Sequence, residues 1–213
     1  MTDLILRGII DVGVARIATN NSTLLVNCGG APSTQLSDIE SGPVILRRRS
    51  RSAEVQLTQE EGGECIEHSI SVGRNVARQL LLRNERRYRV EFDTDTSVMS
   101  FFPKPVSRAR LPLKIGTPFI EDEDNPIPNV VTLRNNQVLI TAGAQVTLGI
   151  IGERLLMKHG LKQKHLQIIG SNIFLDPFVQ LTPRTAEQLG LSEGNAFMEF
   201  NQIKSILRIN PGK

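Results

Sequence analysis

Short runs in which apolar and polar residues alternate recur along the chain, separated by turn-forming residues. A period of two places successive side chains on opposite faces of a strand, and such runs bounded by Gly, Pro, Asn or Asp are typical of β-strands. The runs are residues 4–10, 44–48, 53–58, 146–151, 166–169 and 203–209. Their shortness and number predict a mainly β fold of the small-barrel or compact-sandwich type.

A first landmark occurs twice, as two β-type runs on either side of an Asn-Asn pair. It spans residues 12–26, around Asn20 and Asn21, and returns in residues 129–140 at an offset of 115. Asn tolerates the positive φ that a tight hairpin turn needs. We therefore predict a β-hairpin at each place.

A second landmark follows the first in each half of the chain. Residues 71–82 and the strand-like run 88–92 resemble residues 181–191 and 197–200, at an offset of 109. In each copy a Ser or Thr is expected to cap a short helix with one apolar face, and a turn leads into the strand. The coinciding residues are Ala77, Gln79, Leu80 and Leu82 with Ala186, Gln188, Leu189 and Leu191.

The short helix must hide its apolar face against the strand that follows it. We therefore expect Ala186, Leu189 and Leu191 in one core with Phe197 or Phe200. Truncating Leu189 should then cost about 2 to 5 kcal/mol, the range for a buried Leu.

Two landmarks in the same order indicate a duplicated unit, although chance similarity between β-rich segments is the alternative. One core usually serves about 100 to 150 residues, which suits two units in 213 residues. We predict a mainly β chain of two tandem similar small β-barrel-like domains, each with one short helix. The first covers residues 1–105 and the second residues 113–213, and the proline-containing residues 103–112 are typical of a linker.

The capped helix, the Leu-Gly-Leu turn and the alternating strand resemble the half-repeat of double-psi and swapped-hairpin β-barrels. More narrowly, residues 179–200 with the closing run 207–211 look like the small β-domain that precedes the ATP-grasp domain in spore-coat-associated proteins of endospore-forming bacteria. Residues 137–210 carry the resemblance well and residues 44–102 weakly, while the ATP-grasp part is absent. The resemblance implies a binding or assembly module in a sporulating cell, with no catalytic residues to carry over.

Composition and charge narrow the functional classes. Eight Phe, one Tyr and no Trp imply an aliphatic core and a poor platform for stacking nucleic-acid bases. The N-terminus lacks the features of a signal peptide and no run is long enough to span a membrane, so we expect cytoplasmic synthesis and no membrane association. Cys28 and Cys65 match no metal spacing and are interpreted as reduced thiols, with a disulfide as the alternative.

Candidate catalytic groups are few. Asp93 and Asp95 lie in an Asp-Thr-Asp-Thr-Ser run that resembles the Asp-Thr-Gly turn of aspartic proteases, but the Gly is missing and a dyad would require a homodimer. A solvated turn is the competing interpretation. His68, His159 and His165 have no Cys or carboxylate at metal-ligand spacing. We therefore predict no catalytic residue, no cofactor and no metal.

The most marked charged feature is the run that contains Arg47, Arg48, Arg49 and Arg51. On a single strand, every second residue of this run would lie on one face. Such a row could meet phosphates, as in the swapped-hairpin regulators that bind DNA, or an acidic protein surface. A merely solvated edge strand, protected from aggregation by its charges, is the other interpretation.

These observations favour a non-enzymatic structural or partner-binding protein, with a spore-coat or sporulation-associated assembly protein as the specific form. Protein partners and self-association are expected, through the arginine run and an acidic loop that could pair with it. The loop residues are Glu121, Asp122, Glu123 and Asp124. A DNA-binding regulator that uses residues 47–51 is the second interpretation, and an aspartic-protease-like enzyme is the third.

Overall fold

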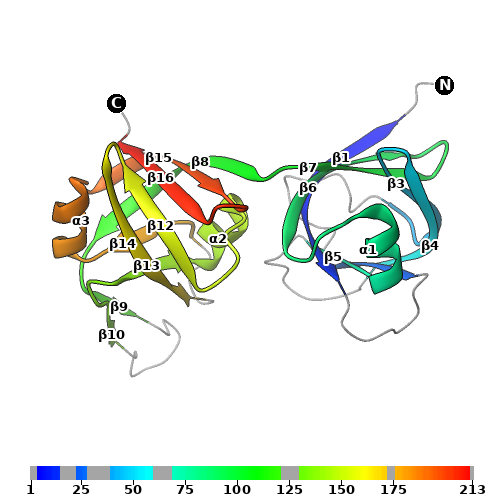
Figure 1. The fold of residues 1–213 in the computed structure, drawn as a ribbon. Helices are drawn as coiled ribbons and strands as arrows, with labels where there is room; N and C mark the ends of the chain where they lie inside the picture. Colours follow the sequence, from blue (N-terminus) through cyan, green and yellow to red (C-terminus); the bar gives the residue numbers. More distant parts are fainter. Residues whose placement is uncertain are drawn as a thin grey trace. The chain divides into compact units, whose positions relative to one another are not determined.

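The computed structural model describes the parts of the chain on which the following account rests. These are residues 4–14, 23–27, 39–59, 69–120, 130–171 and 176–211. The chain divides into two compact units, Met1–Pro105 and Val106–Lys213. Each unit is a closed β-barrel, and the fold is mainly β as predicted (Figure 1).

In the first unit, seven of the strands that the structure describes close the barrel in the order β1-β5-β2-β4-β3-β7-β6. A single described helix follows β5. The elements are β1 (Ile5–Val14), β2 (Thr23–Asn27), β3 (Gly42–Arg48), β4 (Arg51–Gln59), β5 (Ser69–Val72), α1 (Arg74–Leu80), β6 (Arg86–Asp93) and β7 (Val98–Pro103).

The second unit contains an equivalent barrel and a separate two-stranded ribbon, β9-β10. The elements are β8 (Val106–Ile115), β9 (Pro118–Ile120), β10 (Val130–Thr132), β11 (Gln137–Thr141), α2 (Ala142–Leu148), β12 (Arg154–His159), β13 (Lys162–Ser171), β14 (Val179–Leu181), α3 (Pro183–Leu189), β15 (Gly194–Asn201) and β16 (Ile206–Pro211).

The two barrels share one topology. Starting at β8, the second barrel runs β8-β14-β11-β13-β12-β16-β15, which repeats the first order when β8 stands for β1 and β14 for β5. The parallel pairs β1–β5, β2–β4 and β3–β7 recur as β8–β14, β11–β13 and β12–β16. The antiparallel pairs recur in the same way, so the predicted tandem barrels are confirmed.

The register identifies equivalent residues in the two units. Val12 pairs with Ile70 on β5, and Leu113 pairs with Val179 on β14, so Val12 corresponds to Leu113. At its offset of 115, the first landmark had instead matched Val12 to residue 127, and this match is wrong for β1. The second run of the landmark is matched to within one residue, because the register places Val26 on β2 at the position of Ile140 on β11.

The predicted hairpins between β1 and β2, and between β10 and β11, do not form either. β5 lies between β1 and β2 and pairs with both, parallel to β1 and antiparallel to β2. β11 pairs with β13 and β14. The hairpins fail because a strand distant in sequence takes the place of the adjacent one. Asn20 and Asn21 lie outside the described residues.

The barrel interiors are mostly aliphatic, with a few aromatic side chains. In the second unit Ala186, Leu189, Leu191 and Phe200 are buried in one cluster, which confirms the expected packing of the short helix. Phe197 points the other way and is 40% exposed. Alternation along β15 explains the difference, because residues one apart in a strand face opposite sides.

The second unit has two described helices rather than the single one predicted, and Figure 1 shows them on opposite sides of the barrel. Residues 146–151, predicted as a strand, contain the end of α2. The Thr141 hydroxyl accepts a hydrogen bond from the Ala144 amide at 3.4 Å, and the residue after the end of the helix is Gly149, whose φ is 66°. These two caps override the β-propensity of the Val and Thr residues in between.

Helix α3 has the same design, with Thr182 as its cap, Pro at its first position and Gly190 after its end. Helix α1 departs from it. Its N-cap is Gly73, with no side-chain hydrogen bond, and the residue after its end is Leu81, whose φ is 55°. The predicted Ser or Thr cap is therefore present in the second copy and absent from the first.

The predicted linker, residues 103–112, is mostly strand β8, so the second unit begins at Val106 and not at residue 113. Ser107, Leu111 and Leu113 face inward and are buried, and Ala109 on the same side is half-buried against the core, while Arg108, Arg110 and Pro112 are exposed. The prolines concealed this alternation, because proline is uncommon inside strands. Pro112 is nevertheless accommodated opposite Asn195 on β15.

Candidate partner-binding surfaces

The arginine run lies at the tip of the hairpin that joins β3 to β4. Arg48 pairs with Arg51 across the ladder, so Arg49 and Ser50 form a two-residue turn. Arg49 has a φ of 56°. The prediction that Arg47, Arg49 and Arg51 share one face of a strand is wrong, because the chain reverses after Arg48 and breaks the alternation.

Two of these arginines cap the C-terminus of α1. Arg48 Nη1 donates to the carbonyl of Leu80 at 3.1 Å and also to the carbonyl of Leu81. Arg51 Nη1 donates to the carbonyl of Gln79 at 3.1 Å. The last carbonyls of a helix lack intrahelical partners and carry partial negative charge, which favours cations there. Arg48 and Arg51 therefore have a structural role, because they join the β3–β4 hairpin to α1.

The side chains of the other two arginines, Arg47 and Arg49, are available for interactions with a partner. Arg47 and Arg49 are exposed, and among the described residues neither guanidinium group has a hydrogen bond or an ion pair. A buried, unpaired guanidinium would be prohibitively costly, so exposure is the expected state of both. The partner-facing part of the predicted site is thus reduced from four arginines to two.

The second unit has an equivalent basic tip, which the sequence analysis missed. In the β12–β13 hairpin, His159 pairs with Lys162, and Gly160 begins the turn with a φ of 55°. The ring nitrogen Nδ1 of His159 lies 2.9 Å from the carbonyl of Leu189, the last residue of α3. The signal was the Lys158–Lys162 segment, Lys-His-Gly-Leu-Lys, immediately before a strand-like run.

Lys164 continues this capping cluster on β13. Its Nζ donates to Thr185 Oγ1 at 3.2 Å and to Gln188 Oε1, both on α3. Burial lowers the pKa of the Lys164 ammonium, and the nearby charge of Arg184 lowers it further. In both barrels, therefore, side chains of this hairpin contact the helix that follows β5 or β14.

The outer face of the first barrel carries a glutamate between two arginines. Arg89 Nη1 lies 2.8 Å and Arg7 Nε 3.5 Å from Glu91 Oε1. The Arg89 guanidinium also lies 4.6 Å from the ring centroid of Phe102, within the range of a cation–π contact. Phe102 is 39% exposed.

The outer face of the second barrel repeats this arrangement with more cations. Arg108 Nε lies 2.8 Å from Glu199 Oε2, and Arg208 Nη1 lies 3.1 Å from Glu199 Oε1. The hydrogen bond from Arg108 is the main reason that the pKa of Glu199 is lowered, and the hydrogen bond from Arg208 adds to it. Lys158 pairs with Arg208 across β12 and β16. Glu199 is therefore ionised and holds two guanidinium groups in place.

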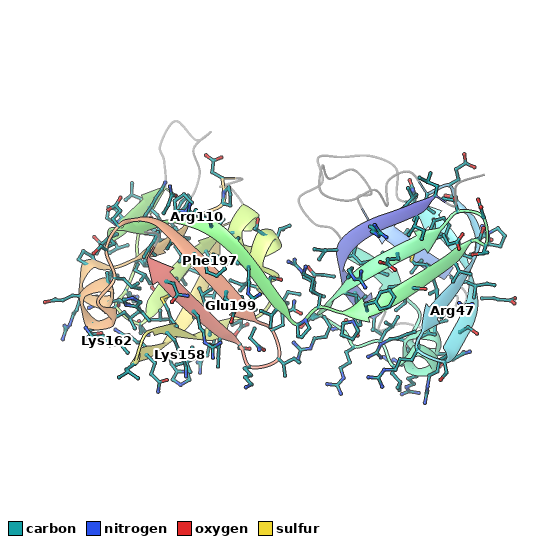
Figure 2. All side chains as sticks on the ribbon, turned by 90° about the horizontal axis from the view of Figure 1, so that it is seen from above. Arg47, Arg110, Lys158, Lys162, Phe197 and Glu199 are labelled. Carbon is teal, nitrogen blue, oxygen red and sulfur yellow. The ribbon has the colours of Figure 1, made fainter. Side chains whose placement is uncertain are left out.

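Phe197 lies beside this charged row. It pairs with Arg110 on β8 and with Asn210 on β16, and Figure 2 shows Arg110, Phe197 and Glu199 on this face. Phe197 and Phe102 are the exposed phenylalanines among the described residues. The sequence led us to expect Phe197 or Phe200 in the core, and the alternation of β15 places Phe200 inside and Phe197 outside.

The Asp93–Ser97 segment forms the turn between β6 and β7. Asp93 Oδ1 accepts hydrogen bonds from the amides of Asp95 at 3.0 Å and Thr96 at 3.1 Å. The bond from the Thr96 amide is the main cause of the lowered pKa of Asp93. In the second unit Asn201 Oδ1 accepts the same two bonds, from the amides of residues 203 and 204. An amide thus serves as well as a carboxylate, which indicates a turn-forming role for Asp93.

Several predicted residues lie outside the described parts of the chain. They are Glu121, Asp122, Glu123, Asp124, Cys28, Cys65 and His68. Where the structure does describe side chains, no three His, Cys, Asp or Glu gather in a way that could hold a metal ion. Nor does any described helix have the length and apolar character to cross a membrane.

Comparisons with known proteins assign neither a family nor a function to this chain. The chain matches no family model, no curated protein and no solved structure. The barrels are therefore identified by their own strand order, and the function has to be argued from the surfaces described above.

Proposed function

We propose that this chain is a non-enzymatic binding protein that docks on acidic partners through the basic hairpin tips of its barrels. The observation that carries the proposal is the pair of exposed cations Arg47 and Arg49 at the β3–β4 tip, which have no acidic partner among the described residues. The remaining cations of that tip donate hydrogen bonds to the end of α1. Because these bonds tie the tip to the helix, the backbone that carries Arg47 and Arg49 loses less conformational entropy on binding than the backbone of a free loop would.

The acidic partner that we propose is a second copy of the chain. Its acidic run supplies four carboxylates in sequence, Glu121, Asp122, Glu123 and Asp124. Pairing between this run and the tip of a neighbouring chain would link barrels into assemblies. The sequence resemblance of residues 137–210 to the barrel domain of spore-coat-associated proteins supports an assembly role of this kind, and a spore coat is the setting that it suggests.

Charge reversal at the tip tests the proposal. Size-exclusion chromatography with light scattering should show self-association of the wild type at low salt and its loss at about 1 M salt, where the Debye length is about 3 Å. The double variant Arg47→Glu and Arg49→Glu should abolish self-association and change the free energy of unfolding by less than about 0.5 kcal/mol. Arg51→Glu is unsuitable, because Arg51 caps α1.

A matched control changes the same number of charges elsewhere. Arg134 and Lys204 are exposed on the second unit, and their reversal to Glu should leave self-association intact. Assemblies that survive the Arg47→Glu and Arg49→Glu change would contradict the proposal and leave the tip with a solubilising role. Assemblies lost equally in both double variants would point to net charge rather than to this surface.

A further inference from the structure

The outer face of the second barrel carries a continuous row of charged side chains over four strands. Cross-strand pairing places Lys158 on β12 beside Arg208 on β16, Arg208 beside Glu199 on β15, and Glu199 beside Arg108 on β8. Adjacent strands are about 4.8 Å apart, so the three cations are spread over about 14 Å along the curved surface of the barrel. A stacked nucleic-acid strand rises about 3.4 Å per nucleotide, so this path has the length of about four nucleotides.

The next row of the same face carries the exposed aromatic ring. It runs from Asn210 through Phe197 to Arg110. Phe197 is 40% exposed on the outer face of the sheet. An exposed aromatic ring among polar and charged side chains is typical of a surface that a ligand covers. Here one cation lies directly beside the ring and the charged row lies next to it along the strands.

We propose that this face binds single-stranded nucleic acid, with a base stacked on Phe197 and phosphates held by Arg108, Arg110, Arg208 and Lys158. Surfaces that bind single strands combine a positively charged track with aromatic side chains, because every base has a π-face and every nucleotide has a phosphate. This inference goes beyond the proposed function, since it concerns a sheet face and not the Arg47 and Arg49 tip.

Glu199 does not oppose the proposal. Both of its oxygens are occupied by arginine N–H groups, at 2.8 Å and 3.1 Å. A carboxylate held in this way orients the two guanidinium groups, and the remaining N–H groups of Arg108 and Arg208 stay available for phosphate. Both arginines are more than half exposed, with side-chain exposures of 64% and 57%.

The first barrel provides an internal contrast, because two of the four cation positions are not cationic there. The register places Ile9 at the position of Arg110 and Ser100 at that of Arg208. Arg7 and Arg47 take the positions of Arg108 and Lys158, and Arg89 takes that of Phe197. Its exposed ring, Phe102, is already covered in part by Arg89. The second barrel is therefore the proposed nucleic-acid site.

Fluorescence anisotropy with a labelled single-stranded oligonucleotide tests this, and a duplex and a poly-glutamate peptide serve as competing ligands. Phe197→Leu keeps an apolar side chain but removes the π-face, and it should weaken single-strand binding about 5- to 150-fold, the equivalent of one stacked base. Arg110→Gln should lower the slope of log K against log salt by about 0.7. Phe102→Leu on the first barrel is the matched control and should leave the affinity unchanged.

Each alternative outcome overturns the inference in a recognisable way. Binding of the oligonucleotide that is unchanged in Phe197→Leu would exclude stacking at this face. Tighter binding of the duplex or of the peptide would identify a different partner class. Absence of oligonucleotide binding at low salt would overturn the inference and would leave the self-association proposed for the Arg47 and Arg49 tip unaffected.

Discussion

The two barrels share their strand order but differ at the positions where the backbone is left-handed. After its short helix, the second barrel has Gly190 with a φ of 69°, and the first has Leu81 with a φ of 55°. At the hairpin tip, the second has Gly160 and the first Arg49, with φ values of 55° and 56°. A left-handed conformation costs a non-glycine residue about 1 to 2 kcal/mol. The barrel topology therefore imposes these conformations even on residues that adopt them at a steric cost.

The same tolerance extends to the polar contacts. Arg48 contacts the end of α1 where His159 contacts the end of α3. Asp93 forms a turn that Asn201 forms in the other unit. At each of these two places the fold requires a hydrogen-bonding group in the correct position, and side chains of different charge can supply it. The charges of these side chains can therefore differ between the two units without a change in the barrel topology.

Core truncation should produce the largest effect and should affect both barrels alike. Leu80 and Leu189 are the last residues of α1 and α3, and their exposures are 0% and 1%. Leu80→Ala and Leu189→Ala should each lower the free energy of unfolding by about 2 to 5 kcal/mol, because each leaves a cavity. Urea unfolding curves measure the loss.

Leu161→Ala is the control, since this leucine at the β12–β13 tip is fully exposed, and it should change stability by less than about 0.5 kcal/mol. A loss below about 1 kcal/mol for either helix variant would show that its helix is peripheral to the barrel. A small loss in only one unit would mean that the two barrels differ in how the helix packs on the core and not only in their turns.

Exchange of the residues after the helices should give smaller effects of opposite sign. Leu81→Gly should stabilise the first barrel by about 1 kcal/mol, and Gly190→Leu should destabilise the second by about 1 to 2 kcal/mol, since only glycine adopts this conformation without a steric cost. Thermal melts of the two variants give the comparison. Two changes of the same sign would mean that side-chain contacts, and not φ, decide the stability at these positions.

The smallest effect concerns pH. The folded-state pKa of Asp93 is lowered, so this carboxylate stabilises the first barrel above its unfolded pKa of about 3.9, and the contribution is lost as the pH falls through the lower folded pKa. Asp93→Asn should remove this dependence, and Asn201→Asp should introduce it into the second barrel. Melts between neutral pH and pH values below about 3.9 test both. An unchanged pH profile in both variants would assign acid sensitivity to other carboxylates.

Local sequence patterns were sufficient for the strands of the β3–β4 hairpin, for part of β13 and for α3, whereas β12 was not predicted. Each of these elements is encoded by neighbouring residues: alternation, a capping Thr and a Gly after the helix. The failures have a common cause. Residues 106–115 and α2 were misjudged because prolines and β-branched residues obscured the local pattern, and burial against distant strands decided the outcome.

The amino-acid sequence was sufficient to indicate the duplication, a largely aliphatic core and the alternation of inward and outward residues in the runs predicted as strands. The position of β5 between β1 and β2 could be seen only in the folded chain, because pairing between distant strands depends on closure of the whole barrel. The tertiary structure also decided that Arg48 and Arg51 cap a helix while Arg47 and Arg49 remain exposed. Likewise it brought Arg108, Glu199 and Arg208 together from three strands, since the neighbours of a residue across a sheet are set by register and not by distance along the chain.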